Sequence, residues 1–322
     1  MLFASLLTSA ALGAAAATSS QCQNPPKRVE WRELGASGQQ QYLKAVTCLQ
    51  STASELGLEN ATRADDFTYV HSHLDKQRSI ITVHFVASFL PWHRLFVHVY
   101  EKALRKCGYE NVMPYWDWTI DSFDVPSSKI WDPETGFGGN GSPNKTSKVS
   151  ETYNMPCVID GPFEHWQPKF YGTDEKQHCL SRSWNDGSEN VGDMFSTQYT
   201  PKAVKKIQAI KHYDDYRQKL ERGPHGAIHS AIGGDMIPNS SPNDPVFFLH
   251  HTQIDRLWWL WQQQNITARA TDFSGIKTQD QNNGVKPPQA SIDDILPMMK
   301  IFDDLEIKEV MTTDTSILCY KY

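Results

Sequence analysis

The chain has 322 residues, of which 39% are hydrophobic and 21% are charged, and its formal net charge at pH 7 is -6. These values are ordinary for one globular domain with a large core. A chain so close to neutrality has no electrostatic reason to bind nucleic acid or an anionic membrane.

Residues 1–17 are predicted to be a signal peptide. The run from Leu2 to Ala17 is apolar and rich in small residues, and it ends in Ala-x-Ala patterns that suit cleavage near Ala17. It is too short and too rich in alanine to favour a transmembrane anchor. Residues 18–322 are then expected to form one secreted domain.

The cysteines agree with a secreted chain, because all six follow the predicted leader. An even number in such a chain predicts up to three disulfides, whose pairing the sequence leaves open. No two are spaced as Cys-x-x-Cys, so a zinc site built from cysteines is not expected. The six are Cys22, Cys48, Cys107, Cys157, Cys179 and Cys319. Asn-x-Ser/Thr sequons that fit the same compartment occur at Asn60, Asn140, Asn144, Asn239 and Asn265.

The first half of the chain contains three predicted helices. Residues 39–57 have a helical composition closed by a glycine, and residues 62–71 follow Thr62 as an N-cap. The clearest helix is 91–108, which Pro91 opens and which carries an apolar stripe.

The second half is expected to alternate between irregular and helical segments. Residues 119–200 are rich in Gly, Pro, Ser and Asn, and we expect long excursions pinned by disulfides rather than a separate domain. Helices are predicted over 200–223 and over 245–264, and the tail from 268 onward looks mixed. The fold class is therefore mainly α, with long irregular loops and little β.

Histidines are concentrated in the second half. His225 and His229 are spaced i, i+4, which places both imidazoles on one face of a helix where they can hold one metal ion. A third ligand is expected from the adjacent pair His250 and His251. Zinc proteases need a glutamate directly after the first histidine, and Gly226 stands there instead, so a hydrolytic zinc site would lack its general base.

The first half supplies a similar set, His71, His73, His84 and His93. Each half can thus offer three imidazoles to a metal. Coordination by nitrogen alone, without carboxylate or thiolate, suits copper better than magnesium, calcium or a structural zinc. Two such sites predict two metals that face each other across a four-helix core.

Four segments carry a resemblance to a known family: FLPWHRLFVHVYEKAL, MPYWDW, PHGAIH and NDPVFFLHHTQIDRLWWLWQ. Together, over about residues 60–265, they resemble the tyrosinase and catechol oxidase (polyphenol oxidase) family of type-3 dicopper proteins, and in particular its short secreted fungal members. The resemblance implies a four-helix bundle that holds a dicopper centre, with two copper ions as cofactor and O2 as co-substrate.

The resemblance also implies a ligand set. The motif Asp-Pro-x-Phe-x-x-x-His-x-x-x-Asp selects His251 rather than His250. In the first half the resemblance places the first ligand at His71, for which His73 remains the competitor. Copper A is then expected to take His71, His84 and His93, and copper B to take His225, His229 and His251.

Three further residues of the family pattern line the expected copper B side. Glu221 corresponds to a glutamate that orients a water, although an exposed charge would give the same sequence. Gly226 stands where monophenol-hydroxylating members often carry an Asn that helps to deprotonate the phenol. Ser230 is a small residue that would leave the entrance open.

Two other motif residues have a structural alternative beside the functional one. Phe247 matches an aromatic that stacks on a copper-B histidine, or it is plain core. Asp255 could accept the ring N–H of His251 and fix its tautomer. Its alternatives are a salt bridge with Arg256 or an exposed carboxylate on the helix face.

The function that the resemblance implies is oxidation of o-diphenols to o-quinones with O2, together with hydroxylation of some monophenols. Because the chain stops after Tyr320-Lys321-Tyr322, we expect a catalytic domain without a C-terminal lid domain. The expected partners are small phenols. The alternatives are a haemocyanin-like O2-binding protein and a zinc hydrolase.

No cysteine neighbours His71 or His84, so a Cys–His thioether is not expected. The histidines that match no motif position are expected to be solvated or hydrogen-bonded: His98, His165, His178 and His212.

Overall fold

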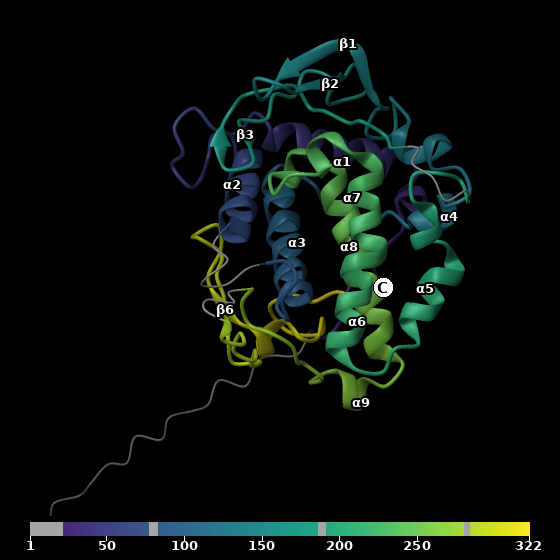
Figure 1. Cartoon of the computed structure of the whole chain (residues 1–322), viewed down its shortest axis with the longest axis vertical. Helices are drawn as coiled ribbons and strands as arrows, with labels where there is room; N and C mark the ends of the chain where they lie inside the picture. Colours follow the sequence, from purple (N-terminus) through teal and green to yellow (C-terminus); the bar gives the residue numbers. More distant parts are fainter. Residues whose placement is uncertain (1–21, 77–82, 186–190, 280–283) are drawn as a thin grey trace, which may run out of the picture.

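Two long buried helices, α3 (Phe89–Lys106) and α8 (Val246–Gln263), pack against each other through the centre of the molecule (Figure 1). The computed structural model describes residues 22–76, 83–185, 191–279 and 284–322, so the predicted signal peptide lies outside the described residues. Both helices lie within three residues of their predicted bounds. Apolar and aromatic side chains cover most of each surface, which is the pattern of helices buried on all sides.

The other helices of the first half are α1 (Gly35–Leu49) and α2 (Arg63–Lys76). Thr62 caps α2 as predicted, because its Oγ1 accepts from the Asp65 backbone N–H (3.2 Å) while Asp65 accepts from the Thr62 N–H (2.8 Å). The helix predicted over 39–57 ends early, at Leu49. The Thr52 hydroxyl there donates to the carbonyl of Cys48 (2.8 Å), and such side-chain bonds favour a turn over continued helix.

The helix predicted over 200–223 is wrong as one element, because it is split into α5 (Pro201–Gln208) and α6 (Tyr213–Leu220). Backbone carbonyls at the break accept hydrogen bonds from side chains distant in sequence rather than from backbone N–H groups of a continuing helix. The Trp261 indole donates to the carbonyl of Ile210 (2.7 Å). The local composition favours one continuous helix, but hydrogen bonds from Trp261 and Gln264 at the end of α8 stabilise the break.

A wide π-helical turn, η5 (Glu221–His225), joins α6 to α7 (Gly226–Ile232). Pro224 lacks a backbone N–H and Gly223 adopts a non-helical ψ of -107°, so the α-helical ladder cannot continue through them. The turn changes the direction of the chain at His225, the N-cap of α7, and His229 follows within α7.

The remaining elements are short. Two helices are α4 (Trp118–Asp121) and α9 (Ile266–Arg269). Antiparallel strands pair as β1 (Gly141–Lys148) with β2 (Asn154–Val158), β3 (Phe170–Tyr171) with β4 (Asp174–Glu175), and β5 (Ile295–Leu296) with β6 (Leu305–Glu306). Single 3-10 turns are η1 (Trp31–Leu34), η2 (Val125–Ser127), η3 (Lys129–Trp131), η4 (Ser196–Gln198), η6 (Gly234–Met236), η7 (Ser241–Asn243) and η9 (Ile307–Val310).

The predicted fold class, mainly α with little β, is confirmed. The segment 119–200 is mostly irregular as expected, although it includes the β1–β2 hairpin. The six cysteines form three disulfides, Cys22–Cys319, Cys48–Cys107 and Cys157–Cys179. Within the described ranges, no helix has the length and apolar character needed to cross a bilayer.

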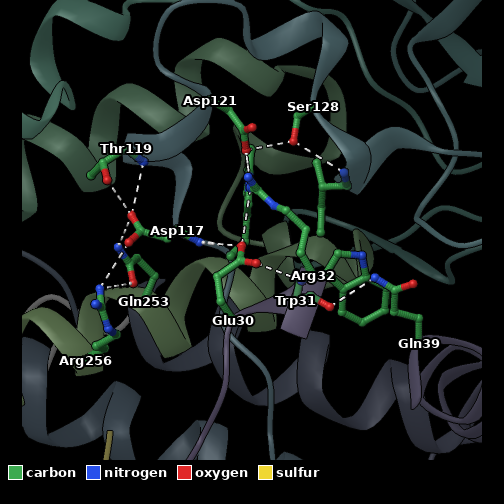
Figure 2. Close-up of polar contacts among 12 residues, drawn as sticks. Glu30, Trp31, Arg32, Gln39, Asp117, Thr119, Asp121, Ser128, Gln253 and Arg256 are labelled. Carbon is green, nitrogen blue, oxygen red and sulfur yellow. Dashed lines mark hydrogen bonds and ion pairs between the residues drawn. The ribbon is translucent and has the colours of Figure 1, made fainter. Parts of the chain in front are cut away.

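A polar network fastens the N-terminal segment to α4 and α8 (Figure 2). Arg32 pairs with Asp121 (2.6 Å), and Glu30 accepts from the backbone N–H of Asp117 (3.3 Å). Asp117 in turn accepts from Gln253 (2.9 Å) and pairs with Arg256 (3.3 Å). The partner of Arg256 on α8 is therefore Asp117, so the predicted alternative of an Asp255–Arg256 salt bridge is wrong.

Asp255 points the other way, into a buried network between α8 and α3. Its Oδ1 accepts from Arg94 Nε (2.5 Å), and its Oδ2 accepts from the hydroxyls of Tyr320 (2.5 Å) and Tyr322 (2.6 Å). Arg28 contributes a second guanidinium at 3.4 Å. Burial alone would raise the pKa of Asp255, but Arg94 and Arg28 outweigh it and hold the pKa below its usual value.

The predicted hydrogen bond from His251 to Asp255 is therefore wrong. Asp255 is 3% exposed, which also excludes a solvent-facing carboxylate. A carboxylate buried this deeply is stabilised far more by two guanidinium groups than by a neutral imidazole. Asp255 holds α8 against α3: it lies one turn after His251, and its partner Arg94 directly follows His93.

Replacing Asp255 with alanine should lower the free energy of unfolding by about 3–5 kcal/mol, because it leaves buried guanidinium charge without its partner. Urea unfolding of the purified protein measures this. The matched control is Glu151→Ala, which breaks the exposed Lys148–Glu151 pair (3.1 Å) and should change stability by less than about 1 kcal/mol. Equal small losses in both variants would show that the network does not stabilise the fold.

A second buried ion pair joins His178 to Asp235. His178 Nε2 lies 2.9 Å from Asp235 Oδ1, and its Nδ1 lies 2.7 Å from the carbonyl of Lys176. Both neighbours are acceptors, so both ring nitrogens donate and the imidazole is cationic. Burial alone would lower the pKa of His178, but the hydrogen bond and charge of Asp235 outweigh it and raise the pKa above its usual value.

A raised folded-state pKa means that this pair stabilises the fold fully at pH values below the unfolded pKa, and that the stabilisation fades as pH rises through the folded pKa. His178→Gln should therefore destabilise by about 3 kcal/mol at about pH 5.5 and by clearly less at about pH 8.5. Urea unfolding at both pH values checks this, with exposed His212→Gln as control. A gap between variant and wild type that widens with pH would contradict the assignment.

Candidate metal centre

Seven histidines form two adjoining groups within the helical core. The first group is His71 on α2, His84 in the loop before α3, and His93 on α3. The second is His225, His229, His250 and His251. In each group the ring nitrogens that could bind a metal all lie within 4.8 Å of one another. The groups touch where His93 stacks on His251, with ring centroids 4.3 Å apart.

Five of these imidazoles have a fixed tautomer, because Nδ1 faces an oxygen that can only accept. The distances are 2.6 Å from His71 to Asn239 O, 2.8 Å from His84 to Asp75 Oδ1, 2.8 Å from His93 to Phe89 O, 3.0 Å from His225 to Glu221 O and 2.6 Å from His229 to Met236 O. Nδ1 must carry the hydrogen in each. In the neutral form of the four rings other than His84, the lone pair is therefore on Nε2. Two such lone pairs, on His71 and His93, face each other at 3.4 Å, an arrangement that a cation would stabilise.

The same argument separates His250 from His251. The Trp118 indole N–H, which can only donate, lies 3.2 Å from His250 Nδ1. The hydrogen of neutral His250 is therefore on Nε2, so that nitrogen has no lone pair for a metal. The His251 ring stacks on His93 and meets Phe247 at a tilt, with centroids 4.1 Å apart. Neither of its ring nitrogens has a hydrogen-bond partner in the described part of the chain.

His71 rather than His73 lies in the first group. The His73 ring stacks on Tyr69, with centroids 3.9 Å apart, and its Nδ1 lies 2.8 Å from the Tyr69 carbonyl. The structure thus brings together the six predicted ligands and places His73 outside the group.

Burial favours the neutral form of every ring in the two groups except His84. It lowers the pKa of His71 to about 3 and that of His229 to about 4. It also lowers the pKa values of His93, His225 and His251 well below the usual value. His84 differs: burial would lower its pKa, but its bond to Asp75 raises it instead. Neutral imidazoles with unshared lone pairs are metal ligands rather than acids.

A cavity of about 400 Å³ gives access to both groups. Its wall includes His71 and His84 of the first group and His225 and His229 of the second. Three predicted site residues also line it, namely Glu221, Gly226 and Ser230. The histidines therefore meet a space large enough for a small aromatic molecule.

Glu221 is buried, so the predicted alternative of an exposed charge is wrong. Its Oε1 accepts from the backbone N–H of Phe85 (2.6 Å), and its Oε2 accepts from Arg217 (2.8 Å). Burial raises the pKa of Glu221, while Arg217 and His84 act in the opposite direction. Through these bonds Glu221 ties the loop that carries His84 to the turn that carries His225.

The other predicted residues lie beside the groups. Phe247 is fully buried, and its ring also meets the His71 ring edge-on at 5.2 Å. A Cβ added at Gly226 would touch only the Glu221 carbonyl, at 3.4 Å, so the backbone there accepts a side chain. Asp255 alone among the predicted site residues faces away from the histidines.

Sequence reasoning missed the oxygens that fix the tautomers. Asn239 and Met236 act through backbone carbonyls, so their side chains carry no signal. Asp75 could have been found, because it lies four residues after His71 on the same helix. The expectation that unmatched histidines are solvated or bonded fails for His98, which is buried without a hydrogen-bond partner among the described residues.

Comparisons with known proteins agree with this arrangement. The family model for the common central domain of tyrosinase matches residues 61–264. The tyrosinase-like protein phomQ1' of Diaporthe leptostromiformis is 40% identical over 314 residues, covering 94% of this chain and 81% of its own. Among solved structures, a mutant polyphenol oxidase from Thermothelomyces thermophila matches with a TM-score of 0.75 and 29% identity, covering 92% of this chain and 88% of its own.

A functional unit of octopus haemocyanin shares the fold, with a TM-score of 0.51 at 22% identity over 75% of this chain and 54% of its own. The matched central domain contains both histidine groups, and such domains are those of type-3 dicopper oxidoreductases. The chain therefore belongs to the tyrosinase family of copper oxidoreductases.

Proposed function

We propose that His71, His84 and His93 hold one copper ion and that His225, His229 and His251 hold a second. The observation that carries this proposal is the hydrogen-bonding of the rings: Nδ1 of five of them faces an acceptor, and in the four other than His84 this puts the Nε2 lone pair on the side of the metal-binding group. His251 completes the second trio from a position stacked on His93. An all-imidazole donor set without carboxylate or thiolate fits copper.

The reaction proposed is oxidation of o-diphenols to o-quinones, in which two diphenols give up four electrons and four protons to one O2 and form two waters. The copper pair, when bound, supplies the two-metal site at which O2 accepts those electrons. The protein holds the imidazoles neutral and oriented, and the cavity admits one aromatic ring. Glu221 lies on its wall, where an oxygen of its carboxylate can hold a water near the phenol hydroxyl.

The open cavity favours an enzyme over an O2 carrier. Phe85 is 45% exposed and Ile237 is 60% exposed at its edge, so described residues leave the histidines accessible to a small phenol. Three disulfides support a secreted protein, since they persist in oxidising compartments. Asn239 is expected to remain unglycosylated, because its side chain donates to the Ser72 carbonyl (3.2 Å) at the cavity wall.

Metal analysis of two adjacent variants tests the ligand set. Copper-loaded wild type and His250→Gln should each contain two coppers per chain, whereas His251→Gln should lose one, because only His251 belongs to the proposed trio. Mass spectrometry after gel filtration measures the ratio. Loss of a copper in His250→Gln with two retained in His251→Gln would reverse the assignment.

Steady-state oxidation of catechol and tyrosine, with O2 uptake followed at the same time, tests the reaction. Wild type should oxidise catechol with one O2 consumed per two quinones. Gly226→Asn should raise the rate on tyrosine relative to catechol by about tenfold, since an amide beside His225 can help a water to deprotonate the phenol. Reversible O2 binding without quinone would instead establish a carrier.

A further inference from the structure

A cation at the edge of the proposed copper cavity, Arg222, has no ionic partner among the residues that the structure describes. Arg222 is exposed, lines the cavity, and forms no ion pair with any of the described residues. Its guanidinium lies over the ring of Phe85, 5.4 Å from the centroid, and Phe85 directly follows His84. The neighbouring Arg217 contrasts with it, because that side chain is buried and paired with Glu221 and Asp214.

The carboxylates that share the cavity wall are already engaged. Glu221 is held by Arg217 and by the backbone N–H of Phe85, and Asp75 lies 2.8 Å from Nδ1 of His84. Neither therefore neutralises Arg222. A guanidinium with free donors beside a substrate cavity is suited to binding a carboxylate.

Arg222 also borders two other hollows, one of about 620 Å³ and one of about 330 Å³. The larger one is lined by Lys206 and Lys219 as well, and no acidic side chain is among its described lining residues. Three cations therefore line this hollow beyond the metal cavity, although the chain as a whole has a net charge of -6.

The same edge carries the exposed apolar side chains of Phe85 and Ile237. An apolar ring or chain could pack between the histidines and Arg222 there. The edge thus offers an apolar surface followed by one cation, which complements a phenol whose carboxylate lies a few bonds from its ring.

We propose that Arg222 determines specificity by pairing with a substrate carboxylate, so that the preferred substrates are phenols and catechols that carry such a group. The inference rests on the proposed oxidase function. Arg222 binds the substrate away from the reacting oxygens, so its contribution depends on the charge of the substrate.

The test compares kcat/KM for 3-(3,4-dihydroxyphenyl)propionate with kcat/KM for its methyl ester on copper-loaded protein. The wild type should prefer the acid by about fivefold at low ionic strength, and the preference should shrink as salt is added. Arg222→Gln should bring the ratio to about one, and Arg222→Glu should bring it below one, because the like charge then repels the acid. Lys202→Gln removes one exposed charge outside these hollows and should keep the wild-type ratio.

The use of a ratio cancels any general loss of copper or of folding in a variant. A wild-type ratio near one, or a ratio unaffected by Arg222→Gln, would overturn the inference while the oxidase function stands. If copper-loaded wild type oxidises neither compound, the proposed function fails and this inference fails with it.

Discussion

The centre of this protein depends on one constraint: each buried imidazole must be neutral and must direct a chosen nitrogen into the shared space. Backbone carbonyls and one carboxylate impose it by accepting from Nδ1. The carbonyl that fixes His71 belongs to Asn239, 168 residues away in sequence. The tautomer of a histidine on α2 is thus set by the loop between α7 and α8, and the complete fold is needed to prepare the ligands.

The relative position of the two groups depends on the contact between α3 and α8. Arg94 follows His93, and Asp255 lies four residues after His251, so their ion pair at 2.5 Å holds the two helices in register beside the histidines. The parallel stack of His93 on His251 lies next to this pair. The hydroxyls of Tyr320 and Tyr322 also donate to Asp255, so residues 320–322 are held against the α3–α8 contact.

Much of the centre could be predicted from the sequence. The i, i+4 pair of His225 and His229 and the motif around His251 depend on local spacing, and helices convert local spacing into geometry. The long buried helices were predictable for the same reason.

Local spacing could not show that Asp255 faces Arg94, since residues on α3 decide this. Nor could it show the break between α5 and α6, where donors from the end of α8 satisfy the carbonyls that a continuous helix would have used. The sequence could not show that Arg222 is exposed beside the cavity either. Its position depends on Phe85 and on hollows that several distant segments line.

The most direct test of the account is a crystal structure of copper-loaded protein with anomalous differences collected on both sides of the copper absorption edge. The account predicts two copper peaks in adjoining positions. One should be bound by Nε2 of His71, His84 and His93, and the other by Nε2 of His225, His229 and His251, with His250 still hydrogen-bonded to Trp118. A single copper peak, or a copper bound by His250 or His73, would contradict it.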